Sequence, residues 1–224
     1  MVIYHGSEYI IKQPMPDLGR KNNDYGQGFY CTLSEDMAKE WATLRGNDGY
    51  ANTYEMDMSG LNVIDLLDGE YSILNWLAIL LANRTFRTDN NLTRQAKDYI
   101  LKQFSVSCDD ADVIIGYRAD DSYFSYAMDF LNNGLSVSNL EKAMRLGKLG
   151  EQIFIKSPQA FERLKYMGSN IALKNEYYPK WLNRDNTARS SYFAMDSDLE
   201  GTFIMDILRE SWRDGDERIQ RIVR

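Results

Sequence analysis

Residues 2–7 read Val-Ile-Tyr-His-Gly-Ser, and residues 26–32 read Gly-Gln-Gly-Phe-Tyr-Cys-Thr. The first stretch predicts a short strand, because its first three residues are β-branched or aromatic. The strand ends at His5, the only histidine of the chain, and Gly6 follows it. Glycine has no Cβ, so a ligand can approach the backbone closely at such a position. The strand end is therefore a candidate ligand site, although a histidine that only bonds a nearby carbonyl would give the same pattern.

The rest of the chain predicts further strands and helices. Alternating residues over 50–58, and short apolar runs over 112–117 and 153–155, predict strands. Apolar residues spaced three and four apart predict helices, with Ser34 as the N-cap of the first. The helices are expected over residues 34–42, 70–104 with a polar interruption at 84–91, 122–132, 138–146 and 158–167.

The composition bounds the class of protein. With 224 residues, of which 44% are hydrophobic, the chain is long enough for one large domain, or for a domain with an appendage. A formal net charge of −7 argues against duplex DNA or an anionic membrane as the partner. It does not exclude a small anionic cofactor, because one arginine and a few backbone amides suffice to bind one.

The cysteines and the apolar runs indicate a cytoplasmic protein. Cys31 and Cys108 are too few for a disulfide framework, and Cys31 lies inside the glycine-rich strand, so we expect both to be free. The most apolar run, residues 73–82, is about half of the ~20 residues that span a membrane. No signal peptide is recognisable, and no histidines and cysteines have the spacing of a metal site.

Taken in order, these segments resemble the ADP-ribosyltransferase superfamily, in its His-Tyr-Glu branch. That branch has His-Gly-Ser or His-Gly-Thr on its first strand, then a Gly-x-Gly strand that leads to a tyrosine, then a second aromatic residue on the next helix. Tyr30 and Trp41 occupy the two aromatic positions here. More narrowly, Tyr-His-Gly-Ser, Tyr-Gly-Gln-Gly-Phe-Tyr-Cys-Thr, Ala-x-x-Trp-Ala and residues 111–121 and 152–160 are similar to DUF3990, an uncharacterised bacterial family grouped with that superfamily.

This resemblance implies an α+β fold, with the split β-sheet of ADP-ribosyltransferases and flanking helices. It implies an NAD-dependent ADP-ribosyltransferase, which transfers ADP-ribose from NAD to an unidentified acceptor (a protein, a nucleic acid or a small molecule) and releases nicotinamide. A bacterial toxin or defence effector, paired with an antitoxin or a regulatory protein, is the biological role that fits. The alternatives are a non-catalytic binder of an NAD-like ligand and a toxin–antitoxin interaction module on the same fold.

The resemblance also assigns the site. His5 would bond a ribose hydroxyl, and Tyr30 and Trp41 would sandwich the nicotinamide ring, where each stacked pair contributes about 0.5–1.5 kcal/mol. Catalytic roles fall on Glu151, His5 and Tyr30. The residues expected to bind NAD are His5, Gly6, Ser7, Arg20, Gly28, Phe29, Tyr30, Trp41 and Gln152. Two of them have a plainer explanation, Trp41 as a core residue of its helix and Arg20 as a solvated arginine of a polar loop.

The catalytic acid is the open point of this assignment. The branch needs a glutamate at the start of a late strand, and residues 151–155 read Glu-Gln-Ile-Phe-Ile. Side chains alternate across a strand, so only one of Glu151 and Gln152 can face the pocket. We favour Glu151, whose carboxylate would stabilise positive charge on the ribose, although Gln152 is the residue expected there in the narrower family. Leu149 stands where arginine-modifying transferases have a second acid, which disfavours arginine as the acceptor.

The last part of the chain differs from the rest. Residues 183–189 are polar and turn-like, and residues 200–223 are charged and amphipathic. We therefore expect one domain over residues 1–182 and a C-terminal helical extension over residues 183–224. The amphipathic face either packs back on the domain or binds a partner, and packing back is the commoner arrangement for such helices.

Overall fold

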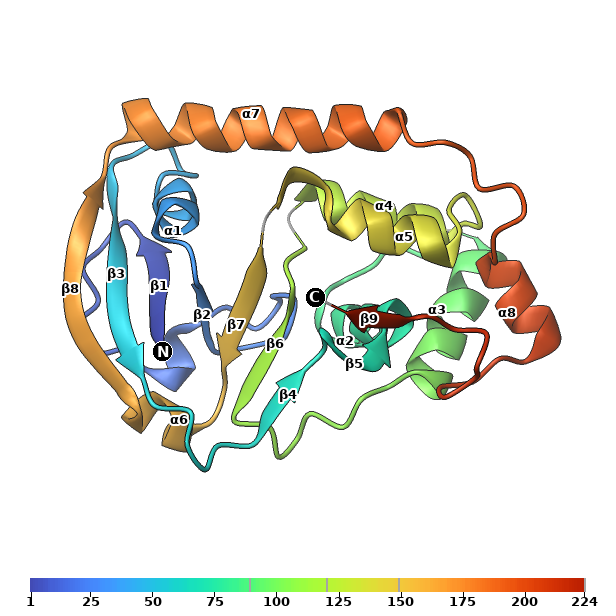
Figure 1. The fold of residues 1–224 in the computed structure, drawn as a ribbon, viewed down its shortest axis with the longest axis horizontal. Helices are drawn as coiled ribbons and strands as arrows, with labels where there is room; N and C mark the ends of the chain where they lie inside the picture. The colour runs from blue at the N-terminus through green and yellow to red at the C-terminus, as the bar shows by residue number, and fades with distance from the viewer. Residues whose placement is uncertain (89, 120, 149, 224) are drawn as a thin grey trace.

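The computed structural model describes residues 1–88, 90–119, 121–148 and 150–223. Within them, seven strands form one sheet in the order β4-β6-β7-β2-β1-β3-β8, and β5 pairs with β9 in a second sheet (Figure 1). The strands are β1 (Val2–Ser7), β2 (Phe29–Thr32), β3 (Gly49–Met56), β4 (Val63–Asp65), β5 (Asp68–Ser72), β6 (Val113–Tyr117), β7 (Glu151–Ile155), β8 (Leu164–Ala172) and β9 (Arg221–Val223). The helices are α1 (Glu35–Ala42), α2 (Ile73–Asn83), α3 (Asn91–Gln103), α4 (Asp121–Leu131), α5 (Val137–Met144), α6 (Pro158–Glu162), α7 (Lys174–Phe193) and α8 (Ile204–Glu210), with short 3-10 helices η1 (Pro16–Leu18) and η2 (Leu146–Lys148).

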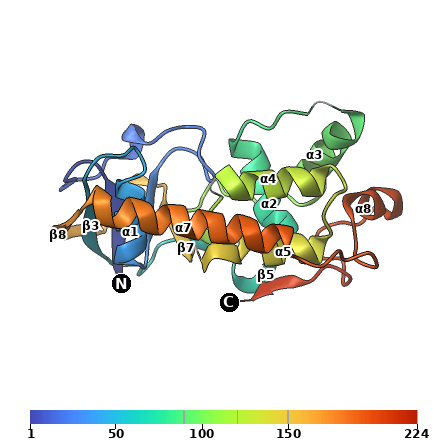
Figure 2. The same cartoon turned by 90° about the horizontal axis from the view of Figure 1, so that it is seen from above.

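The larger sheet is mostly antiparallel, since β4 and β6 are its one parallel pair among the described strands. With helices around it, the chain has the α+β fold expected from the sequence. Helices α2, α3, α4, α5 and α8 gather at one end of the molecule, and α7 runs along the outside from β8 toward that end (Figures 1 and 2). Of the helices in the described ranges, none combines the length and the apolar character that crossing a membrane requires.

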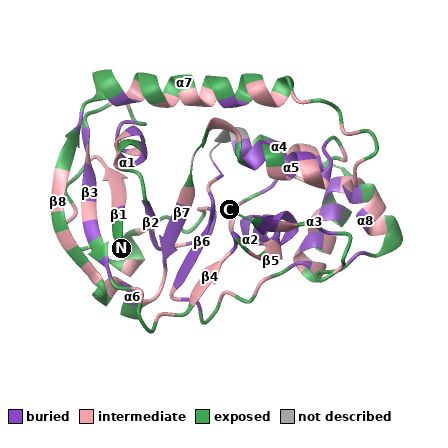
Figure 3. Ribbon diagram, viewed as in Figure 1, coloured by how far each residue is buried: buried purple, intermediate pink, exposed green. Residues whose placement is uncertain are grey.

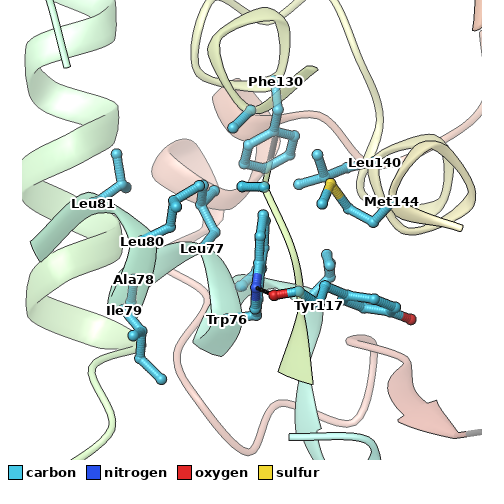
Figure 4. Packing of buried hydrophobic residues seen from close by; sticks show 14 of the residues in the cluster. Trp76, Leu77, Ala78, Ile79, Leu80, Leu81, Tyr117, Phe130, Leu140 and Met144 are labelled. Carbon is cyan, nitrogen blue, oxygen red and sulfur yellow. Dashed lines mark hydrogen bonds between the residues drawn. The ribbon is translucent and has the colours of Figure 1, made fainter. Parts of the chain in front are cut away.

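The main hydrophobic core lies between the sheet and these helices (Figure 3). Helix α2 is at its centre, and residues 73–81 of this helix are all buried. Trp76 donates a hydrogen bond of 3.2 Å from Nε1 to the carbonyl oxygen of Tyr117 at the end of β6 (Figure 4). This bond satisfies a buried indole N–H and fixes α2 against the sheet.

A second core covers the other face of the sheet and includes Ile3, Cys31 and Ile153. Cys31 is fully buried there, and burial raises the pKa of its thiol well above the usual value. Because side chains alternate along β2, Tyr30 points to the opposite face. Both cysteines are free, as expected from the sequence.

The structure corrects parts of three predicted helical segments. Residues 70–72 of the helix expected over 70–104 belong to β5, and the extension expected to be helical over 183–224 contains β9. The helix expected over residues 158–167 ends at Glu162, and residues 164–172 form β8, which pairs along β3 at the edge of the sheet. The sequence marks the start of α6, where Ser157 is the N-cap and Pro158 follows, far more clearly than its end.

Helix α7 replaces an expected turn. Residues 183–189 lie inside it, so the domain boundary expected after residue 182 falls in the middle of a helix. Tertiary contacts hold this helix, since Arg184 donates to both carboxylate oxygens of the buried Glu40 in α1, at 2.9 and 2.8 Å. It also donates to the carbonyl oxygen of Gly147, at 2.9 Å. Packing of this kind stabilises a helix that has no continuous apolar face.

The tail packs back on the domain, the commoner of the two arrangements considered above. Ile204 and Ile207 of α8 and Ile222 of β9 are fully buried in the main core. Strand β9 pairs with β5, more than a hundred residues earlier in the chain. The apolar face of the tail is therefore part of the core.

Candidate ligand-binding site

A cavity forms where β1 and β2 separate. Among the described residues, these neighbouring strands pair only at Tyr4 and Thr32, whereas β1 pairs with β3 over its whole length. Beyond that pair, Nδ1 of His5 lies 2.7 Å from the carbonyl oxygen of Tyr30. A side chain thus joins the two strands in place of the backbone ladder. The cavity has a volume of about 670 Å³ and borders β1, β2, α1 and the loop between the two strands.

Every residue that the resemblance assigns to NAD binding lines this cavity. They come from β1, the loop that follows it, β2, α1 and β7, which are far apart in the sequence. Of the three catalytic candidates, His5 and Tyr30 line the cavity and Glu151 does not.

His5 is held as a neutral imidazole. Its ring stacks on Phe29, with 4.2 Å between ring centres and 26° between ring planes. Burial lowers the pKa of His5 from 6.5 to about 4, and this effect outweighs the hydrogen bond to Tyr30, which raises the pKa. Because Nδ1 faces a carbonyl oxygen, it carries the proton, and Nε2 is left as an acceptor. The site therefore offers an acceptor suited to a ligand hydroxyl.

The two aromatic residues expected to sandwich nicotinamide, Tyr30 and Trp41, both make contacts within the protein. The Tyr30 hydroxyl donates to the carbonyl oxygen of Gly26 at 2.5 Å and accepts from the backbone N–H of Tyr25 at 3.2 Å, and burial raises its pKa. The guanidinium of Arg118 lies over the ring of Trp41, 4.0 Å from the ring centre. One face of Trp41 is thus covered, so a ligand ring can stack on that face only if Arg118 moves.

The two glycines of the predicted site serve packing. A Cβ at Gly6 would lie 1.9 Å from the carbonyl oxygen of Ala38 in α1, and a Cβ at Gly28 would lie 2.4 Å from the ring of Phe154. The missing Cβ of Gly6 therefore makes room for α1 against β1, and Gly6 also borders the cavity. This close approach also places Trp41, which α1 carries, at the wall of the cavity.

Arginines from four separate segments line the cavity. They are Arg20, Arg45, Arg84 and Arg118. Only Arg20 was expected from the sequence, because folding brings in the others from the ends of α1, α2 and β6. Arg118 directly follows a predicted strand, which was the one available sequence signal. Two acids, Glu8 and Asp24, also line the cavity. The distance from Nη1 of Arg45 to Oε2 of Glu8 is 3.1 Å, and the distance from Nη1 of Arg84 to Oδ1 of Asp24 is 3.4 Å.

Strand β7 presents Gln152 to the cavity. Gln152 is opposite Gly116 of β6, is 5% exposed and lines the cavity. Glu151 is opposite Tyr117 and lines a separate pocket of about 250 Å³. Because neighbouring side chains of a strand point to opposite sides, the expectation that Glu151 faces the cavity is wrong. Leu149, used above to disfavour an arginine acceptor, lies outside the described residues.

Comparison with known proteins gives one match. The model of a family described as "Protein of unknown function (DUF3990)" matches residues 1–166. Comparisons with curated proteins and with solved structures found no match. The matched part includes the described residues that line the cavity, from His5 to Gln152, whereas α7 and the tail lie beyond it. Since most of its length is matched, the chain belongs to the DUF3990 family.

Proposed function

We propose that the cavity binds NAD+ and that the chain transfers ADP-ribose from it to an acceptor. One observation carries this proposal: His5, Tyr30 and Trp41, the residues that the resemblance assigns to NAD, line a single cavity together with a group of arginines. The volume of about 670 Å³ is within the range of roughly 300–1,000 Å³ that is usual for small-molecule pockets.

The charge of the cavity favours a phosphate-bearing ligand. Four of the described arginines line it, against Glu8 and Asp24, in a chain whose net charge is −7. Arginine donates two parallel hydrogen bonds to phosphate oxygens, and its charge is permanent. Such a local excess of positive charge in an acidic protein supports a ligand with a diphosphate, as in a dinucleotide.

The imidazole supports the sugar part of the same ligand. Nε2 of His5 is an acceptor in a neutral ring, and a ribose hydroxyl is the donor that suits it. The separation of β1 and β2 beyond Tyr4 and Thr32 also resembles the split sheet that the superfamily implies. A diphosphate and a ribose are both parts of NAD+.

In ADP-ribosyl transfer, the bond between nicotinamide and ribose breaks and its electron pair leaves with nicotinamide. An acceptor oxygen or nitrogen then bonds the ribose carbon and loses its proton. The chain contributes by holding the ligand and by placing an anion near the positive charge that develops on the ribose. With Glu151 on the other side of β7, the described carboxylates that line the cavity are Glu8 and Asp24, and Asp24 is the more buried of the two.

A second candidate function is a non-catalytic binder of an NAD-like ligand. Gln152 favours it, because an amide stands at the place where the transferase pattern expects a carboxylate. An amide can hold a ligand by hydrogen bonds but carries no charge to stabilise a cation. The third alternative, in which the tail docks a partner, is not favoured, because Ile204 and Ile207 are buried in the core.

Calorimetric titration with NAD+ tests the binding step. The wild type should bind, and His5→Ala should bind about tenfold more weakly, the effect of one lost hydrogen bond. Lys180→Ala, on the outer surface of α7, is the control and should bind like the wild type. Absence of binding by the wild type, or equal affinity for His5→Ala, rejects the proposed site.

Release of nicotinamide separates the two candidates. A transferase should release it from NAD+, and Glu151→Gln should release it at the wild-type rate, because Glu151 is outside the cavity. Gln152→Glu supplies a carboxylate inside the cavity, so it should release nicotinamide about tenfold faster than the wild type. Binding of NAD+ without release of nicotinamide supports the non-catalytic candidate. A tenfold slower release by Glu151→Gln would show that Glu151, and not Gln152, faces the cavity from β7.

A further inference from the structure

Two buried polar atoms without a partner belong to the cavity wall. Among the described residues, no group bonds Oε1 of Gln152 or Nε1 of Trp41. Both side chains line the cavity, one from β7 and one from α1. Buried polar groups of folded proteins are nearly always bonded, because an unmade hydrogen bond is costly. Two such atoms on one cavity therefore indicate a ligand that bonds them.

The chemistry of the two atoms restricts the ligand group. An indole N–H only donates, and an amide oxygen only accepts. The ligand group must therefore offer one acceptor and one donor. A primary carboxamide offers both on one carbon atom, its oxygen for the indole and its NH2 for the glutamine. A carboxylate offers acceptors only, so with the amide of Gln152 in its present orientation it would leave Oε1 without a partner.

The surroundings of Trp41 agree with recognition by its edge. Arg118 covers one face of the indole, at 4.0 Å from the ring centre. The N–H lies on the edge of the ring, which this contact does not use. Because both unbonded atoms are buried, a small rotation of the side chains toward the cavity has to accompany binding.

We propose that Gln152 and Trp41 recognise the carboxamide of the nicotinamide group. In this arrangement Trp41 donates from Nε1 to the carboxamide oxygen, and Oε1 of Gln152 accepts from the carboxamide NH2. The pair selects dinucleotides that carry nicotinamide over those that carry nicotinic acid. The inference rests on the proposed function, because it assigns a part of NAD+ to a part of the same cavity.

The experiment compares three probes by calorimetric titration: NAD+, nicotinic acid adenine dinucleotide, and ADP-ribose, which lacks the ring. The wild type should bind NAD+ at least tenfold more tightly than the nicotinic acid dinucleotide. Gln152→Leu, which keeps the size of the side chain and removes its polar atoms, should abolish this preference and leave the affinity for ADP-ribose unchanged. Trp41→Phe, which keeps an aromatic ring and removes the N–H, should reduce the preference as well.

The outcomes separate this inference from the proposed function. If the wild type binds both dinucleotides and ADP-ribose equally, and His5→Ala weakens all three, the NAD site stands and the carboxamide assignment is refuted. A Gln152→Leu variant that loses affinity for all three probes alike refutes it too, since a uniform loss means that the side chain maintains the shape of the cavity and does not select the ring. If the wild type binds none of the probes, the proposed function and this inference both fail.

Discussion

His5 should stay neutral until the pH falls to about 4, because burial against Phe29 lowers its pKa from 6.5. In the unfolded chain the same imidazole takes up its proton near pH 6.5. Between these two values the unfolded chain binds more protons than the folded chain, so the free energy of unfolding falls as the pH falls. The contribution of the neutral His5 ring to the free energy of unfolding is fully present above pH 6.5 and is lost completely below about pH 4.

The size of this effect follows from the two pKa values. A fall from 6.5 to about 4 corresponds to about 3 kcal/mol, at about 1.4 kcal/mol for each tenfold change in proton affinity. The side chain of His5 is only half-buried, so water screens part of the penalty and about 2 kcal/mol remains. That is a sizeable part of the roughly 5–15 kcal/mol that stabilises a typical domain.

Proton NMR measures the pKa directly, because a chain with one histidine gives one imidazole signal to follow. Urea unfolding at pH 7 and pH 4.5 measures the free energy. His5→Asn is the control: its amide can donate to the carbonyl oxygen of Tyr30, and it does not titrate, so the histidine part of the pH dependence should vanish. A measured pKa of 6 or above, or an unchanged pH dependence in the variant, would refute the burial of a neutral ring.

Three further changes test the packing around the site. Gly6→Ala should lower the free energy of unfolding by about 3 kcal/mol in urea, because its Cβ would meet a carbonyl oxygen of α1 at 1.9 Å, and unchanged stability would show that α1 is farther away. Arg184→Ala should cost about 3 kcal/mol in the same assay, because it leaves the buried Glu40 unpaired, whereas Lys180→Ala on the same helix, whose ion pair is exposed, should change little. Deletion of residues 200–224 should abolish the cooperative thermal transition, since three fully buried isoleucines are removed, and a folded product would mean that the tail is dispensable.

The resemblance named much of the candidate site, and local chemistry explains part of its arrangement. Ser34 accepts a hydrogen bond from the backbone N–H of Met37 at 3.2 Å, so a side chain visible in the sequence fixes the start of α1. The first two strands were equally visible, and once α1 begins at its cap, the spacing along the helix carries Trp41 to the cavity. The position of Trp41 therefore follows from a feature that the sequence records, whereas His5 and Tyr30 meet through the pairing of β1 with β2.

The sequence could not show which side chains of β7 face the cavity. Residues 153–155 are apolar on both sides of the strand, since each side of the sheet has its own core, so alternation gives no direction for Glu151 and Gln152. The folded chain decides it, because Gln152 lines the cavity and Glu151 lines a separate pocket. Helix α7 was missed for a similar reason, because the pairing of Arg184 with Glu40 joins positions that are 144 residues apart.

The pairing of β5 with β9 has a consequence for the time at which the chain can fold. Among the strands that the structure describes, β5 has no partner in its sheet until residues 221–223 have been synthesised, and Ile222 has no exposed surface once it is in place. Contacts of such long range are slow to form. A ribosome-bound chain in which residues 221–223 have not yet been made therefore leaves the main core open at that side, so completion of the fold follows synthesis of the helices around it.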